Sequence, residues 1–188
     1  AMVAWSAALM RPDLFQAVAA LSVPFRARHP AAPPLALLRA DGRDNFYWFY
    51  FNREGVPEAE FERDIPAAMR RVLVYGSGDA PAGRALGLMV APGGGFLDGC
   101  DDPAVLPAWL TPADIEAYAA GFRRSGFRGG FNWYRNLDRN WALTAPFQGA
   151  KILPPALFIA GTHDGVINSK MGRKHLEQMD AQVPQLRA

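Results

Sequence analysis

The stretch Ala156-Leu157-Phe158-Ile159-Ala160-Gly161 is followed directly by the polar residues Thr162, His163 and Asp164. A short apolar run that ends in a glycine and then in polar residues is typical of a buried strand in a parallel sheet. This pattern places the Asp164 carboxylate at the carboxyl edge of the sheet, where catalytic groups gather in open α/β folds. Asp164 is alternatively a turn residue that caps the next helix, and the residues alone favour neither interpretation. Neighbouring side chains on an extended segment point oppositely, so we expect His163 to be a loop residue and not a partner of Asp164.

The beginning of the chain has the same character. Residues 2–10 are mostly apolar and predict a short helix that ends at Arg11-Pro12, and residues 17–23 predict a buried strand. Because this helix has almost no polar face, we expect it to be buried. Residues 169–179 predict a final amphipathic helix. Apolar strands and helices at both ends of the sequence predict an α/β fold.

The middle of the chain is helical and aromatic instead. Residues 45–51 are almost all aromatic, and residues 57–74 predict a helix with acidic residues early and basic residues late, the order that a helix dipole favours. Thr111 predicts the start of a further helix, followed by proline in its first turn and ending at Gly126. Residues 76–107 are rich in Gly and Pro, so we expect an irregular excursion there.

These changes of character predict the domain organisation. Two core segments, residues 1–24 and 150–188, bracket an inserted helical lid of residues 25–149. A core with an insertion explains why α/β patterns occur only at the two ends of the sequence.

The composition of the 188-residue chain excludes several classes of protein. Half of the residues are hydrophobic and a fifth are charged, which excludes general disorder. The net charge is +2 and the basic residues are scattered, so we expect neither a nucleic-acid partner nor a membrane partner. No apolar run reaches membrane-spanning length, and no basic segment precedes the apolar residues 1–10 as in a signal peptide. We therefore expect a soluble, cytoplasmic protein.

The residues that commonly bind metals or form disulfides are few. Cys100 is the single cysteine, so it forms no internal disulfide, and no neighbour marks it as a nucleophile. The three histidines have no metal-ligand spacing, and we expect no metal and no cofactor. His29 and His175 are expected at the surface. Gly93-Gly94-Gly95 lacks the Lys and Ser/Thr of a phosphate-binding loop and is expected to be flexible.

Tyr47 and Tyr134 each lie in an aromatic cluster of the middle region. Such clusters usually belong to a hydrophobic core. The alternative is a phenol whose hydroxyl points into a cavity and donates a hydrogen bond to a reacting oxygen. The residues alone do not decide between these two interpretations.

The stretch Gly126-Phe127-Arg128-Gly129-Gly130-Phe131-Asn132-Trp133-Tyr134-Arg135-Asn136 resembles the lid motif of the soluble epoxide hydrolases, within the α/β-hydrolase superfamily. Further similar segments are residues 47–51 with 55–60, residues 155–164, and residues 1–5 with 22–25. The resemblance spans nearly the whole chain in the right order and is weakest over residues 75–107. It implies an α/β-hydrolase fold with a helical lid inserted in the core, of which this sequence is a partial chain.

The resemblance also implies a reaction. In this family an aspartate attacks an epoxide carbon to form an ester, two lid tyrosines hold the epoxide oxygen, and a histidine oriented by an acid activates water. By motif, the tyrosines are Tyr47 and Tyr134 and the acid is Asp164; Tyr50, one helical turn from Tyr47, is the alternative. The implied partners are a small-molecule epoxide and water, and the product is a vicinal diol. The residues expected to line the pocket are Met2, Phe25 and Trp133.

Two parts of the family pattern fall outside the sequence. The nucleophile elbow, Gly-x-nucleophile-x-Gly, would lie about three residues before Ala1. The histidine would lie beyond a further strand after Ala188, and His175 is on the wrong element for that role. We therefore expect an internal fragment that is inactive alone and leaves a face and an edge of the strand at residues 17–23 uncovered. The alternatives are another lidded hydrolase, such as a haloalkane dehalogenase or an esterase, and a non-catalytic binding module.

Overall fold

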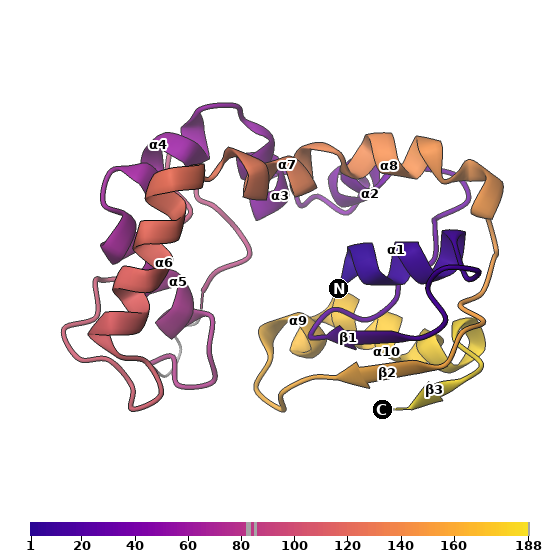
Figure 1. Cartoon of the computed structure of the whole chain (residues 1–188). Helices are drawn as coiled ribbons and strands as arrows, with labels where there is room; N and C mark the ends of the chain where they lie inside the picture. The colour runs from indigo at the N-terminus through magenta and orange to yellow at the C-terminus, as the bar shows by residue number, and fades with distance from the viewer. Residues whose placement is uncertain (82–83, 85, 188) are drawn as a thin grey trace. The chain divides into compact units, whose positions relative to one another are not determined.

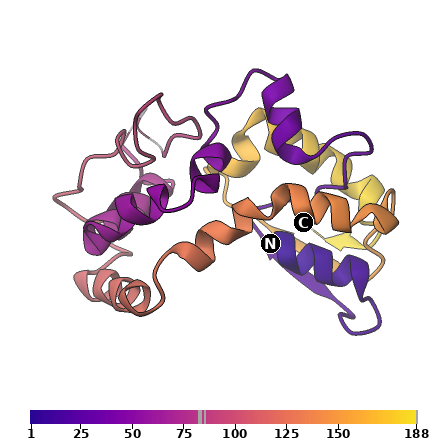
Figure 2. The ribbon, with the colours of Figure 1, turned by 90° about the horizontal axis from the view of Figure 1, so that it is seen from above.

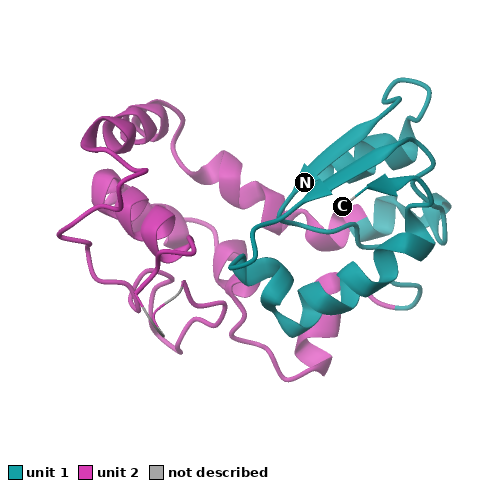
Figure 3. Ribbon diagram, turned by 90° about the horizontal axis from the view of Figure 1, so that it is seen from below, with its two compact units in different colours: residues 1–31, 141–188 teal, residues 32–140 magenta. Residues whose placement is uncertain are grey.

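The computed structural model describes residues 1–81, 84 and 86–187. The chain divides into two compact units, drawn in different colours in Figure 3. Unit 1 comprises residues 1–31 and 141–188, and unit 2 comprises residues 32–140. Unit 1 thus combines the two ends of the sequence, and unit 2 is inserted between them. The assignment of residues 25–149 as a functional lid stays a prediction.

Unit 1 is built on a parallel sheet with the strand order β1-β2-β3 (Figure 1). Strand β1 (Val18–Leu21) pairs with β2 (Ala156–Ile159), and β2 pairs with β3 (Leu186–Arg187). In this register Val18 lies opposite Ala156 and Leu21 lies opposite Ile159. The next strand was expected only after Ala188, but it begins at Leu186. Parallel pairing of the two predicted strands confirms an α/β arrangement for this unit.

Helices cover one face of this sheet. Helix α1 (Met2–Met10) lies alongside β1, as Figures 1 and 2 show, and α10 (Lys170–Gln182) follows the short helix α9 (Gly165–Asn168). The 3-10 helix η1 (Ala145–Phe147) precedes β2 in the sequence. The buried core joins α1, the sheet and α10 through Trp5, Ala8, Val18, Ala20, Phe25, Ile152, Ala156, Phe158, Met179 and Val183.

The other face of the sheet is exposed in this chain. Burial alternates along β1 and β2, so that Leu21 is 64% exposed and Ile159 is 52% exposed. Met2 and Val3 on α1 are exposed as well. Full burial of α1 and of the strand at residues 17–23 was therefore a wrong expectation, because packing partners cover only one side of each. The uncovered strand face was predicted correctly.

Unit 2 is helical. Its elements are α2 (Pro34–Ala40), α3 (Tyr47–Asn52), α4 (Val56–Glu62), α5 (Ile65–Tyr75), α6 (Pro112–Ser125), α7 (Arg128–Arg135) and the first residues of α8 (Leu137–Leu143). Aromatic and aliphatic side chains from α3 to α7 form one buried cluster that includes Phe51, Phe61, Met69, Ile115 and Phe131. The aromatic segments of the sequence are thus the core of this unit.

Capping residues set the helix boundaries of unit 2. The single helix expected over residues 57–74 is two helices, because Asp64 caps α5 by accepting a hydrogen bond from the Ala67 amide at 3.0 Å. Helix α6 begins as predicted: Thr111 and Asp114 form a reciprocal capping box. It ends before Gly126, whose φ of +63° favours glycine.

The described residues between 76 and 107 form turns and irregular backbone, as expected. An isolated antiparallel bridge joins Phe46 to Met89. The run Gly93-Gly94-Gly95 was expected to be flexible, but two of its glycines donate hydrogen bonds. Gly94 donates to the Ala91 carbonyl at 2.9 Å, and Gly95 donates to the Asp98 carboxylate at 2.7 Å. In the described part of the chain no helix has the length and apolar character needed to span a membrane.

Candidate active site

Tyr47 and Tyr134 come from distant parts of the sequence and meet in unit 2. Tyr47 is the first residue of α3, and Tyr134 lies on α7. Their ring centroids are 5.5 Å apart, with an angle of 73° between the ring planes. Asn52, at the end of α3, donates hydrogen bonds to the Trp48 carbonyl at 2.8 Å and to the Tyr134 carbonyl at 3.2 Å. The two helices therefore hold the two phenols edge to face.

The surroundings of Tyr134 favour its neutral phenol form. Burial, the proximity of the Tyr47 phenol and a hydrogen bond between the two side chains all raise the pKa of Tyr134 above its usual value. A phenol with a raised pKa stays protonated near neutral pH. It can then donate its proton in a hydrogen bond to an oxygen that becomes negatively charged.

Aromatic rings fix the orientation of the pair. The Phe51 ring lies 5.4 Å from that of Tyr47 and 4.9 Å from that of Tyr134. Phe131 packs behind Phe51 at 4.7 Å, and Phe96 lies 5.8 Å from Tyr47. Edge-to-face and tilted contacts of this kind add to the stabilisation from burial alone. The aromatic clusters therefore belong to the hydrophobic core, which was one of the two interpretations of the sequence. The packing of this core positions the two phenols.

Tyr50, the alternative to Tyr47, has a different environment. It is only 6% exposed, and its hydroxyl donates a hydrogen bond to Glu60 Oε2 at 2.8 Å. Burial and the Glu60 carboxylate raise the pKa of Tyr50. Because the Tyr47 ring, not the Tyr50 ring, contacts Tyr134, the geometry favours Tyr47 as the partner of Tyr134.

Asp164 lies in unit 1, after the carboxyl end of β2. Its Oδ1 accepts a hydrogen bond from the Val166 amide at 2.7 Å, so Asp164 caps α9. Asn168 strengthens the turn by donating to the carbonyls of Thr162 and Asp164, at 2.8 and 3.0 Å. Asp164 thus caps a helix and also lies at the edge of the sheet. The sequence had left these open as two alternative interpretations. His163 is an exposed residue of the same turn, as expected.

Comparison with known proteins shows a consistent similarity. The chain is 44% identical over 170 residues to Epoxide hydrolase A of Mycobacterium tuberculosis, which covers 89% of this chain and 52% of that protein. It is 40% identical over 164 residues to Epoxide hydrolase 1 of Siraitia grosvenorii, which covers 87% of this chain and 50% of that protein. The chain thus spans about half the length of the curated relatives it matches. No family model matches the chain.

Solved structures of epoxide hydrolases are also similar to this chain. An epoxide hydrolase from an endophytic Streptomyces superposes with a TM-score of 0.89 at 38% identity, covering 99% of this chain and 56% of that one. Epoxide Hydrolase A from Mycobacterium thermoresistibile superposes with a TM-score of 0.83 at 42% identity, covering 98% and 57%. The chain is thus similar in sequence and in structure to a segment of α/β-hydrolase-fold epoxide hydrolases. The resemblance and the fold class predicted from the sequence are confirmed.

Unit 2 also contains a buried ion pair beside Tyr134. Arg135 on α7 donates to both carboxylate oxygens of Glu58 on α4, at 2.6 and 2.9 Å. Hydrogen bonding from Arg135 lowers the pKa of Glu58. Both side chains are about 90% buried, so the pair anchors α7 and with it Tyr134. Neither residue received a role from the sequence, since nothing in the sequence pairs them.

The three residues expected to line the substrate pocket differ in burial. Phe25 is 5% exposed and packs against Trp5 with ring centroids 5.9 Å apart. Met2, at the start of α1, and Trp133, on α7, have exposed side chains. Their role as pocket walls stays a prediction.

His175 is not the surface residue that the sequence suggested. It lies half-buried on α10. Burial, together with the positive charges of Arg26 and Lys174, lowers its pKa to about 4. The expectation was wrong because the charged neighbours Arg173 and Lys174 suggested a fully solvated face.

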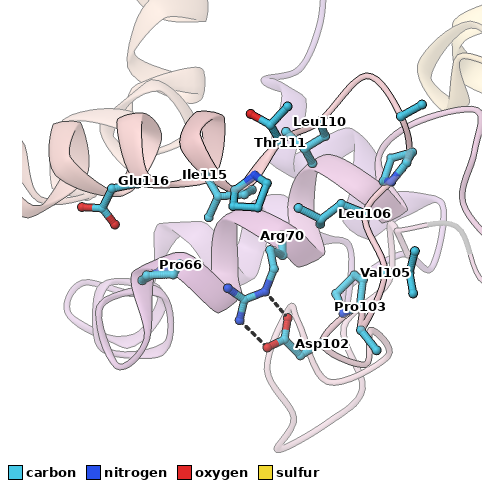
Figure 4. Close-up of a pocket in the computed structure, with 14 residues that line it drawn as sticks. Pro66, Arg70, Asp102, Pro103, Val105, Leu106, Leu110, Thr111, Ile115 and Glu116 are labelled. Atoms are coloured by element: carbon cyan, nitrogen blue, oxygen red, sulfur yellow. Dashed lines mark hydrogen bonds and ion pairs between the residues drawn. The ribbon is translucent and has the colours of Figure 1, made fainter.

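Unit 2 also has a groove of about 870 Å³, which does not involve the tyrosine pair. Figure 4 shows it between the beginnings of α5 and α6 and the loop that precedes α6, with Arg70 paired to Asp102 on its wall. The described residues that line this groove include four prolines, which are Pro66, Pro103, Pro107 and Pro112. Among the residues that the structure describes, no group of His, Cys, Asp or Glu is arranged to hold a metal ion.

Proposed function

We propose that the whole protein containing this chain is an epoxide hydrolase that opens an epoxide to a vicinal diol. The observation that carries the proposal is the edge-to-face contact of Tyr47 and Tyr134, 5.5 Å apart, with the raised pKa of Tyr134. The similarity to named epoxide hydrolases along nearly the whole chain supports it.

In the proposed reaction an aspartate oxygen attacks one epoxide carbon and the carbon–oxygen bond of the ring breaks. The oxygen that leaves the carbon becomes an alkoxide, and the hydroxyls of Tyr47 and Tyr134 donate hydrogen bonds to it. An alkoxide is a stronger base than a phenolate, so one phenol then transfers its proton to the alkoxide. Donors that are already oriented stabilise this developing charge without a reorganisation cost during the reaction.

The second step hydrolyses the aspartyl ester. A histidine takes a proton from water, and the resulting hydroxide attacks the ester carbonyl. The ester carbon–oxygen bond breaks, the diol oxygen that leaves takes up the proton of the new carboxyl group, and the aspartate is restored. The histidinium then gives up its proton, which reprotonates the tyrosine that had become a phenolate. We assign to Asp164 the role of orienting that histidine, because its carboxylate is fixed at the carboxyl edge of the sheet by the Val166 amide. The nucleophilic aspartate and the histidine are assigned to no residue of this chain, so we expect the isolated chain to be inactive.

We further propose that the substrate pocket is lined by Met2, Phe25 and Trp133. The partners in the reaction are a small-molecule epoxide and water. The tyrosine pair weighs against a haloalkane dehalogenase, since a halide leaving group does not need protonation. An esterase needs a serine nucleophile instead and would form no alkoxide from a strained ring.

The test is single-turnover hydrolysis of styrene oxide by the whole protein in H₂¹⁸O, followed by mass spectrometry of the diol. With an aspartyl ester, the oxygen added to the first diol comes from the enzyme, so the diol is unlabelled and label appears in the aspartate. Full labelling of the first diol would mean direct attack by water. Absence of any diol would contradict the proposed activity.

A further inference from the structure

The carboxylate of Glu60, on α4, accepts hydrogen bonds from two other segments of unit 2. Its Oε2 accepts from the Tyr50 hydroxyl at 2.8 Å and from the Phe96 amide at 3.1 Å. Its Oε1 accepts from the Leu97 amide at 2.9 Å. One carboxylate thus ties both helix α3 and the loop of residues 93–97 to α4.

The loop is shaped for close approach to this carboxylate. A Cβ atom on Gly95 would collide with Glu60 Oε1, and one on Gly94 would lie 3.0 Å from Asp98 Oδ2. Asp98 accepts the hydrogen bond of the Gly95 amide at 2.7 Å. A side chain at position 95 would displace the Glu60 carboxylate, and one at position 94 would crowd that of Asp98. We call the hydrogen bonds from Tyr50, Phe96 and Leu97 to Glu60 the Glu60 clamp.

Both segments that Glu60 binds, helix α3 and the loop of residues 93–97, help to hold Tyr47. Tyr50 lies one turn after Tyr47 on α3, so the hydrogen bond to Glu60 restrains the helix that carries Tyr47. The Phe96 ring lies 5.8 Å from the Tyr47 ring and 4.8 Å from the Phe51 ring. Movement of Phe96 would therefore remove a packing contact from Tyr47 and change how its ring is held.

We propose that Glu60 is a positioning residue for epoxide opening, which fixes the Tyr47 ring through Tyr50 and Phe96. The inference rests on the proposed function, in which Tyr47 donates to the epoxide oxygen. A misplacement of about 1 Å at a reacting group costs up to about a hundredfold in rate. Loss of the clamp should therefore lower kcat and change KM little, since Glu60 itself does not touch the substrate.

The first experiment compares Glu60→Gln with Glu62→Gln in the whole enzyme, with styrene oxide as substrate. Glutamine keeps one acceptor oxygen and turns an amide donor toward groups that are themselves donors. Glu62 lies on the same helix but accepts from the Phe127 amide, at 3.2 Å. We expect Glu60→Gln to lower kcat by about tenfold with KM nearly constant, and Glu62→Gln to leave both unchanged.

A double-variant cycle with Tyr47→Phe distinguishes positioning from a general structural effect. Without the Tyr47 hydroxyl, Glu60→Gln should cause no further loss of kcat, because the group that it positions is gone. Equal losses in both backgrounds, or an unchanged kcat for Glu60→Gln alone, would overturn the inference. If Glu60→Gln does not fold, as judged by circular dichroism, Phe96→Leu takes its place in the same cycle, with the same outcomes deciding.

The same measurements distinguish an error in the proposed function from an error in the role of Glu60. A wild-type enzyme that forms no diol contradicts the proposed function and the inference together. A Tyr47→Phe enzyme with the wild-type kcat removes the role of Tyr47 and with it that of Glu60. A strongly impaired Tyr47→Phe enzyme with additive losses on Glu60→Gln overturns only the inference.

Discussion

In the proposed reaction, a phenol that donates a proton must stay protonated until the alkoxide forms. The described environment of Tyr134 does this through burial and through its contact with Tyr47, both of which raise its pKa. The same burial excludes water from its ring, which strengthens the hydrogen bonds that the hydroxyl makes. At the residue scale, therefore, the packing of two aromatic clusters also sets the acid–base properties of the site.

Removing one hydroxyl should affect the chemical step more than the fold. We expect Tyr134→Phe to lower kcat on epoxides by about a hundredfold, the usual cost of losing one donor to a developing oxyanion. Steady-state kinetics and a thermal melt of the whole enzyme measure the two effects. The matched control is Tyr118→Phe, which removes an exposed hydroxyl on α6 and should leave kcat unchanged. Equal effects of both variants would remove the special role of Tyr134.

His175 is expected to stay neutral down to acidic pH. Its pKa is lowered from 6.5 to about 4 by burial first, then by the charges of Arg26 and Lys174. The unfolded chain therefore binds this proton more readily than the folded one between those values. The stabilising contribution is complete above about pH 6.5 and decreases as the pH falls toward about 4.

An NMR titration of the His175 ring carbons tests this prediction. The resonances should titrate near pH 4, and Arg26→Gln should move the midpoint upward because one positive charge is removed. A midpoint near 6.5 in the unaltered protein would contradict the account of its burial.

Sequence patterns predicted single residues only where a family motif or a helix cap marked them. Tyr47, Tyr134 and Asp164 were singled out in this way, and their catalytic roles stay predictions. Glu58 and Glu60 received no role, since Arg135 lies 77 residues from Glu58, and the Phe96 and Leu97 amides lie 36 and 37 residues from Glu60. Pairing of this kind arises from tertiary packing, which a single sequence does not contain.

At the scale of elements, the end of each helix depends on specific caps. Asp64 separates α4 from α5 by accepting the Ala67 amide, with proline in the first turn of α5. We expect Asp64→Ala to lower the free energy of unfolding by about 1 kcal/mol, as loss of a helix cap usually does. Urea unfolding of the whole protein measures it, with Arg63→Ala as the neighbouring control. Equal stability of both variants would show that the cap contributes nothing.

The sequence predicted elements best where a cap or a glycine limited them. Helix α6 was predicted almost to the residue, because Thr111, Pro112 and Gly126 mark both ends. The break at Asp64 was missed, because the charge order over residues 57–74 was equally typical of one longer helix. Strand β3 is only two residues long and carries no periodicity that could reveal it.

At the scale of the molecule, unit 1 has an apolar sheet face with no cover in this chain. Leu21, Leu157 and Ile159 lie on that face and are between 41% and 64% exposed. An apolar patch of this kind favours association. We expect the isolated chain to self-associate in size-exclusion chromatography with light scattering, and the double variant Leu157→Lys, Ile159→Lys to associate less. A monodisperse monomer of the unaltered chain would contradict this prediction.

The proposed reaction depends most directly on the paired hydroxyls of Tyr47 and Tyr134. Its test is the rate constant of ring opening, measured in a single turnover of the whole enzyme with both tyrosines changed to phenylalanine. We expect ring opening to be nearly abolished while the variant keeps the fold and thermal stability of the unaltered enzyme. Ring opening at the original rate in this double variant would contradict it.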